Sequence, residues 1–271
     1  MCDPHPAMCF TADDRPPLPP IRGGSVDARD LTLTSRDGTP VPAFAARADA
    51  PTGAGIVVVP DVRGLHPYYE ELVLRFAEAG VHALAFDFYA RSAGSQRRDA
   101  DFDPQPHVLQ LDVNRVNEDV AAAVAALRAP EGGTPERVFT VGFCLGGRIS
   151  LLQATSGLGL AGVIGFYPWP TGEHRSKLPA PTDEAPRFGC PVLTLYGEAD
   201  PGIGPEAREA FAHALAQAGV DHRSVTYPGA PHSFFDRKAE EHADASADAW
   251  RQVLEFVGVS ESSDVADWSR G

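Results

Sequence analysis

The sequence is poor in cysteine and has no long apolar stretch. Four cysteines among 271 residues are too few for a disulfide scaffold of this size. No run of about 18 apolar residues occurs, so we expect neither a transmembrane helix nor a membrane partner. The first 25 residues also lack the apolar core of a secretory signal. Export by that route is therefore not expected, and the cytoplasm is the predicted location.

Basic residues are scarce as well. The chain has 23 lysines and arginines against 37 acidic residues, which leaves a net charge of −14. A field of that sign repels polyanions, so nucleic acid is not an expected partner. A small anionic substrate stays possible where a local arginine offsets the field.

The amino-terminal stretch contains Cys2, His5 and Cys9, which together could supply three metal ligands. No fourth ligand is evident, so the favoured interpretation is a tail with incidental thiols and no metal site. Composition divides the chain into an irregular Pro-rich extension, a single α/β domain and a polar tail, over residues 1–25, 26–258 and 259–271.

Two patterns of apolar residues indicate the fold. Residues 30–34 and 41–46 flank the turn signal Asp37-Gly38 and predict an antiparallel hairpin at a sheet edge. After the hairpin, short apolar runs alternate with stretches of helical spacing. These predict strands over 56–60, 81–86, 138–141, 161–166, 191–196 and 223–227, and helices over 68–79, 107–128, 205–218 and 243–257, with another after Gly146.

This alternation predicts an α/β fold with a mostly parallel sheet and helices on both faces. The Pro-rich stretch 168–187 is expected to be a loop. Ligands bind outside the carboxyl ends of the strands in such sheets. Chemistry is therefore expected just after Pro60, Phe86, Val141, Tyr196 and Tyr227.

The strongest chemical signal is Gly142-Phe143-Cys144-Leu145-Gly146-Gly147, between a predicted strand and a predicted helix. It matches the nucleophile elbow G-x-S-x-G with cysteine in place of serine. The glycines suit a tight turn, and the helix dipole favours a thiolate at Cys144. The alternative is a tight turn that holds a buried, inert cysteine.

An elbow nucleophile needs a base and an acid that orients the base, in the chain order nucleophile, acid, histidine. Asp200 follows one predicted strand and His232 follows the last one. Asp200 can fix the tautomer of the imidazole, and His232 can act as the base for Cys144. Glu198 lies on the same loop as Asp200 and is the rival acid.

The reaction also needs donors for the oxyanion and groups that hold the substrate. The backbone N–H groups of Leu145 and Val62 are the predicted oxyanion donors. Asp61 and Arg63, on either side of Val62, form an ordinary surface ion pair or else face the nucleophile. Arg91 follows another strand and either holds a substrate carboxylate or pairs with a neighbouring acid.

From about residue 30 to 257 the chain resembles the dienelactone hydrolase family, the carboxymethylenebutenolidases. The markers are Pro60-Asp61-Val62-Arg63-Gly64, Asp87-Phe88-Tyr89-Ala90-Arg91, the elbow, the Asp200 loop and His232-Ser233-Phe234. The resemblance implies an α/β-hydrolase fold and a triad of Cys144, His232 and Asp200. It also implies hydrolysis of a carboxylated enol lactone through an acyl-thioester, without a cofactor.

Two departures from the family pattern matter, one for the resting thiol and one for the substrate. Asp61 stands where the family commonly has a glutamate that governs the resting thiol, and aspartate is one methylene shorter. Asp236 stands where a second arginine is common in the family, although Arg237 could substitute for it. A substrate other than a carboxylated lactone therefore stays open.

Three other functions compete with this hypothesis. Class I glutamine amidotransferases share the elbow, but their histidine is followed two residues later by glutamate, where this chain has Phe234. A broad-specificity esterase or thioesterase on the same fold is the main alternative. A non-catalytic protein that binds a small ligand is the third, because fold alone does not fix function.

Overall fold

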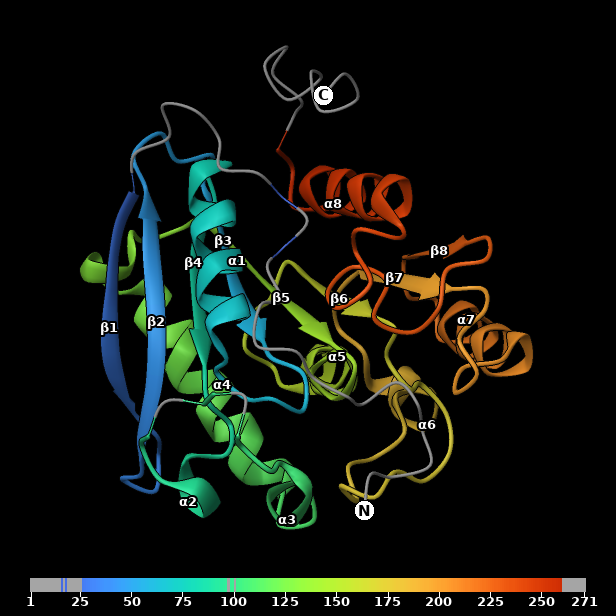
Figure 1. The fold of residues 1–271 in the computed structure, drawn as a ribbon, viewed down its shortest axis with the longest axis horizontal. Helices are drawn as coiled ribbons and strands as arrows, with labels where there is room; N and C mark the ends of the chain where they lie inside the picture. The colour runs from blue at the N-terminus through green and yellow to red at the C-terminus, as the bar shows by residue number, and fades with distance from the viewer. Residues whose placement is uncertain (1–15, 17, 19–25, 97, 100, 260–271) are drawn as a thin grey trace.

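A computed structural model describes residues 16, 18, 26–96, 98–99 and 101–259 (Figure 1). Within them, eight strands form one sheet in the order β1-β2-β4-β3-β5-β6-β7-β8. The strands are β1 (Val26–Thr34), β2 (Pro40–Ala48), β3 (Ala54–Val59), β4 (His82–Phe86), β5 (Arg137–Phe143), β6 (Gly162–Phe166), β7 (Val192–Gly197) and β8 (His222–Tyr227). Strands β3 to β8 pair in parallel, while β2 pairs antiparallel with both β1 and β4. The predicted mostly parallel sheet with an antiparallel amino-terminal hairpin is confirmed.

The hairpin turns at Gly38, which has a φ of 85°, a value that favours glycine. Every residue of β3, β4, β6 and β7 is buried. Complete burial explains why these strands are continuous apolar runs in the sequence instead of alternating patterns. The amino-terminal extension also reaches the core, since Leu18 is buried there.

Helices cover both faces of the sheet (Figure 1). On one face α1 lies beside α8, where the rings of Phe76 and Trp250 are 4.7 Å apart. On the other face Gln153, just after α5, donates to Asn117 of α4 at 2.8 Å. The longer helices are α1 (Pro67–Glu78), α4 (Val113–Arg128), α5 (Leu145–Leu152), α7 (Pro205–Gln217) and α8 (Ala243–Phe256). Short ones are α2 (Ala90–Ala93), α3 (Gln105–Val108) and α6 (Pro181–Glu184).

The single helix predicted over 107–128 is wrong at its start. The structure has α3 there, then a break, and α4 begins only after Asp112. Asp112 is extended, and its carboxylate accepts the N–H groups of Asn114 and Arg115, which makes it an N-cap. The apolar spacing continued across this break, so periodicity alone did not reveal it.

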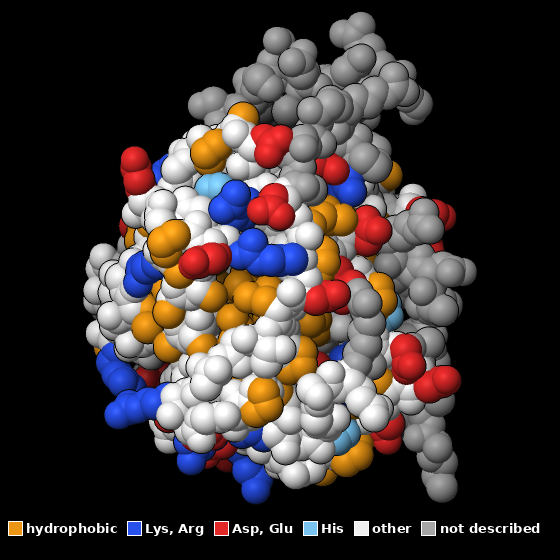
Figure 2. Space-filling view, turned by 90° about the vertical axis from the view of Figure 1, so that its left-hand side faces the viewer, with side chains coloured by type: hydrophobic (Ala, Val, Ile, Leu, Met, Phe, Trp, Pro, Cys, Tyr) orange, Lys and Arg blue, Asp and Glu red, His pale blue; other side chains and the backbone are white. Residues whose placement is uncertain are grey.

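The surface on the β1 side of the molecule carries both signs of charge around an apolar middle (Figure 2). The net charge of −14 therefore does not make this face uniformly acidic. In the described part of the chain, none of the helices combines the length and the apolar character needed to cross a membrane. Cys2, His5 and Cys9 lie outside the described residues.

Candidate active site

Cys144 occupies the sharp turn between β5 and α5. Its φ of 55° is a value that non-glycine residues rarely adopt. A Cβ atom at Gly142 would overlap the carbonyl oxygen of Gly146, and one at Gly146 would overlap that of Pro60. Only glycines therefore allow the backbone to turn this tightly, and the turn holds Cys144 in a strained conformation typical of functional sites.

His232 and Asp200 meet beside this turn, although they are separated by 32 residues. The Nδ1 atom of His232 lies 2.6 Å from Oδ2 of Asp200, and both side chains are buried. The other carboxylate oxygen of Asp200 accepts the Gly202 N–H at 2.8 Å. Glu198, the rival acid, is instead exposed and accepts the N–H of Gly229 at 3.0 Å.

The second ring nitrogen of His232 lies on the side of Cys144. Burial lowers the pKa of His232, but negative charge on Cys144, contact with its sulfur and the hydrogen bond that His232 donates to Asp200 together raise it to about 10. Nε2 itself is buried and has no well-formed hydrogen bond within the described residues. The contact with sulfur is thus looser than a hydrogen bond, as is common in active sites without substrate.

The two predicted oxyanion donors lie at the turns that follow β5 and β3. Leu145 is the first residue of α5, so its N–H has no acceptor inside the helix. In the turn after β3, the Asp61 N–H donates a hydrogen bond to Tyr69 Oη. The Arg63 N–H donates one to the Asp61 carboxylate. Val62 lies between these two residues and is buried. Neither of the two hydrogen bonds uses its N–H.

Asp61 and Arg63 belong to a buried charge cluster, so the interpretation as a surface ion pair is wrong. Nε of Arg63 contacts both carboxylate oxygens of Asp61, at 3.0 and 3.1 Å, and its Nη2 lies 3.2 Å from Asp236. Arg237 completes the cluster, 3.9 Å from Asp61. Although burial alone raises the pKa of Asp61, the two arginines hold it below its usual value.

The cluster also interacts electrostatically with Cys144. Burial lowers the pKa of Arg237, but the charges of Asp236, Asp61 and Cys144 raise it above its usual value. Cys144 and Arg237 are therefore within electrostatic reach of each other.

Comparison with known proteins assigns the family. The model of the dienelactone hydrolase family matches residues 41–260. The chain belongs to this family. A carboxymethylenebutenolidase from Rhodococcus opacus is 29% identical over 257 residues, which cover 92% of this chain and 96% of that protein. A Salmonella typhimurium protein provisionally given the same name is 31% identical over 241 residues, 86% of this chain and 87% of that protein.

A solved structure from Klebsiella pneumoniae, provisionally named a dienelactone hydrolase, has the same fold. Its TM-score is 0.76 at 28% sequence identity, over 87% of this chain and 100% of that one. The resemblance, the α/β-hydrolase fold and the prediction of a dienelactone hydrolase-like enzyme are thereby confirmed.

Trp169 is a contact of this dienelactone hydrolase-like site that the sequence reasoning missed. Its ring stacks on His232 with centroids 5.0 Å apart and an angle of 23° between the planes. Its Nε1 donates to the carbonyl of Gly202 at 3.1 Å. Since the Gly202 N–H binds Asp200, one short segment fixes both Asp200 and the indole that stacks on His232. The Pro-rich composition of this stretch gave no sign of such a contact.

Arg148, one turn after Cys144, was also missed. Its side chain is buried and donates to backbone carbonyls of the 168–187 loop, those of Trp169, Thr171, Gly172, Leu178 and Pro179. Burial lowers the pKa of Arg148 to about 10. The elbow helix therefore holds the loop that carries Trp169. The available signal was that Arg148 is the one charged residue in α5.

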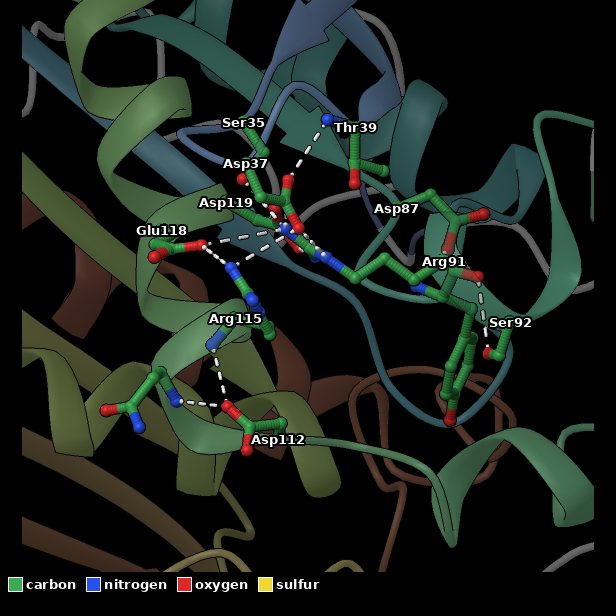
Figure 3. A network of polar contacts seen from close by, with 12 residues as sticks. Ser35, Asp37, Thr39, Asp87, Arg91, Ser92, Asp112, Arg115, Glu118 and Asp119 are labelled. Carbon is green, nitrogen blue, oxygen red and sulfur yellow. Dashed lines mark hydrogen bonds and ion pairs between the residues drawn. The ribbon is translucent and has the colours of Figure 1, made fainter.

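Arg91 is engaged by acids far from it in sequence (Figure 3). Its Nε lies 2.9 Å from Asp37 and its Nη1 lies 2.6 Å from Asp119, while Nη2 donates to Ser35 at 2.8 Å. Glu118 and Arg115 join the same network. These contacts match the alternative in which Arg91 pairs with neighbouring acids.

The described residues contain no group of three or more histidine, cysteine, aspartate or glutamate side chains arranged to hold a metal ion.

Proposed function

We propose that this protein cleaves an ester or lactone with Cys144 as nucleophile, His232 as general acid and base, and Asp200 as the group that orients His232. The proposal is supported by three buried side chains from the ends of β5, β7 and β8: Asp200 contacts His232 at 2.6 Å, and Cys144, at a strained turn, raises the pKa of His232. This is the arrangement that nucleophilic acyl transfer requires.

The first half of the reaction forms an acyl-thioester. The sulfur of Cys144 attacks the substrate carbonyl, and the N–H groups of Leu145 and Val62 stabilise the oxyanion. When the tetrahedral intermediate collapses, the C–O bond to the leaving alcohol breaks. His232 gives its Nε2 proton to that oxygen, and Asp200 holds the ring in place at 2.6 Å.

The second half hydrolyses this thioester. His232, now neutral, takes a proton from water, and the resulting hydroxide attacks the thioester carbonyl. The C–S bond then breaks, the carboxylic acid leaves, and the Cys144 and His232 pair returns to its starting state. These steps use only side chains, backbone amides and water, so we propose no metal or cofactor. The cytoplasmic location remains a prediction from sequence.

A broad-specificity esterase or thioesterase remains the second candidate. The specific observation that favours it is the contact set of Arg91, which is bound to Asp37 and Asp119. A dedicated enzyme for carboxylated lactones would have to obtain its carboxylate contact elsewhere.

The decisive experiment is Cys144→Ala, assayed on an aryl ester, a lactone and a thioester. We expect at least a ~10⁴-fold loss of kcat/KM, because triad members act as a unit. Intact-mass spectrometry of quenched wild-type protein should show an acyl adduct that the variant lacks. Cys190→Ala is the matched control, since Cys190 is half-buried and burial raises its pKa to about 11. Retention of more than about a tenth of the activity by Cys144→Ala would exclude the mechanism.

A further inference from the structure

The imidazole ring of His232 is contacted at its edge and on its face by different segments. At the edge, Nδ1 lies 2.6 Å from Oδ2 of Asp200. One hydrogen bond fixes a ring nitrogen but leaves the plane of the ring free to turn. On the face, the indole of Trp169 stacks with centroids 5.0 Å apart and an angle of 23° between the planes. The plane of the ring decides where Nε2 points, so the face contact bears directly on proton transfer.

The indole of Trp169 also stacks on a second imidazole. The ring of His174 lies 5.5 Å from it, at an angle of 27°. Burial, together with the charges of Arg148 and Arg175, lowers the pKa of His174 to about 4, so this ring is neutral at neutral pH. His232 is charged there, since its pKa is raised to about 10. The indole therefore contacts one neutral ring that supports it and one cation that its π face attracts.

Two further contacts hold Trp169 in place. Arg148 of the elbow helix donates to the backbone carbonyl of Trp169 at 3.0 Å, and the indole Nε1 donates to the carbonyl of Gly202 at 3.1 Å. A Cβ atom at Gly202 would lie only 2.9 Å from Nε1, so the close approach requires glycine. The place of the indole is thus set by the segments that carry Cys144 and Asp200.

We infer that Trp169 is a positioning residue, whose indole face holds the imidazole of His232 in the plane from which Nε2 reaches Cys144 and the leaving oxygen. The inference rests on the proposed function and adds a residue that acts through His232. Asp200 fixes one end of the ring and Trp169 fixes its plane. Both half-reactions pass a proton through His232, so a ring free to turn should slow both of them.

The first test compares Trp169→Leu with Trp169→Phe. Both substitutions remove the donor to Gly202, but only phenylalanine keeps an aromatic face, which makes the pair matched. We expect Trp169→Leu to lower kcat by roughly 10- to 100-fold, with KM within about threefold, because a misplaced base costs up to about 10² in rate. The factor should be the same for an aryl ester, a lactone and a thioester. Trp169→Phe should recover most of this loss.

The second test observes the ring of His232 directly by NMR. Protons over the face of an aromatic ring resonate upfield, so the ring protons of His232 should move downfield in Trp169→Leu and stay near their wild-type positions in Trp169→Phe. The Nδ1 proton should exchange faster with water in Trp169→Leu, because the ring is no longer held and covered. This comparison needs no turnover. It therefore stays informative even where the Cys144→Ala experiment rejects the proposed mechanism.

A third test displaces the indole without removing it. In Gly202→Ala the new Cβ would meet Nε1, and we expect kcat to fall roughly three- to tenfold as the indole shifts. The smaller ring of Trp169→Phe leaves room for that Cβ. The double variant should therefore be no slower than Trp169→Phe alone. Additive losses would show that Gly202→Ala acts through Asp200 and would count against the indole.

Three further outcomes would overturn the inference. One is a kcat for Trp169→Leu within about twofold of wild type, far from the loss expected for a misplaced base. Another is an equal loss in Trp169→Leu and Trp169→Phe, which would assign the effect to the hydrogen bond with Gly202. The last is a loss confined to KM or to one substrate, which would place Trp169 against the substrate. Thermal melting of each variant separates these outcomes from misfolding.

Discussion

Two networks of arginine and aspartate lie on the loops of this sheet, and they differ in burial and in charge balance. In the cluster beside Cys144, Arg63 and Asp61 have side chains that are 5% and 0% exposed, and two arginines meet two aspartates. In the Arg91 network, Arg91 and Asp37 are 24% and 21% exposed although Asp119 is 0% exposed, and three acids meet two arginines. The first lies within electrostatic reach of Cys144, and the second ties the hairpin to α4.

The difference shows that an arginine after a strand has no fixed role. Breaking a buried ion pair costs much free energy, because the remaining charge then lies unpaired in the low-dielectric interior. A pair near the surface is screened by water and contributes little. Interactions at the Cys144 site should therefore respond strongly to single substitutions, and those of the Arg91 network only weakly.

The largest effect should come from the acid of the Cys144 site. Asp200→Asn should lower kcat by about 10³- to 10⁴-fold with little change in melting temperature, because the amide favours the wrong imidazole tautomer. Glu198→Gln is the matched control and should be mild, since Glu198 is exposed and bonds only a backbone N–H. The reverse ranking in steady-state assays would assign the orienting role to Glu198.

A second effect concerns stability within the buried cluster. Asp61→Asn should lower the free energy of unfolding by about 3 kcal/mol, the low end for a broken buried pair, because Asp236 still faces Arg63. Urea unfolding followed by circular dichroism measures the change. A loss below about 1 kcal/mol would mean that the buried cluster behaves like an exposed one.

A third prediction concerns the proton of His232. Its raised pKa means that the folded state binds this proton more tightly than the unfolded state. The resulting stability is full below the ordinary value of 6.5 and is lost as the pH rises through about 10. In Cys144→Ala the pKa of His232 should fall, because a negative neighbour is removed. NMR titration of the imidazole measures this, and an unchanged pKa would show that Cys144 and His232 are not coupled.

The smallest effect should come from the Arg91 network. Asp37→Asn makes the same substitution as Asp61→Asn and likewise removes a partner of an arginine Nε. Arg91 keeps Asp119, and exposed pairs contribute little, so the melting temperature should change by no more than about 2 °C and kcat/KM should not change. A loss of stability as large as that of Asp61→Asn would show that the two networks do not differ in this way.

The sequence determined the features that depend on neighbouring residues. Apolar runs gave the buried strands, glycines around Cys144 gave the elbow, and the positions of Asp200 and His232 after separate strands placed them at one edge. These signals are local because backbone conformation and strand burial are set over a few residues. The parallel sheet then brings the ends of distant strands together without further information.

Only the tertiary structure decided which charged groups pair. Arg91 binds Asp37, 54 positions away, and Arg63 binds Asp236, 173 positions away. The stacking of Trp169 on His232 likewise joins two separate loops. An arginine offers the same donors wherever it stands, so its local sequence does not reveal its partner. The partner is chosen by where chain segments meet and by how much water remains between them, and both are properties of the packed molecule.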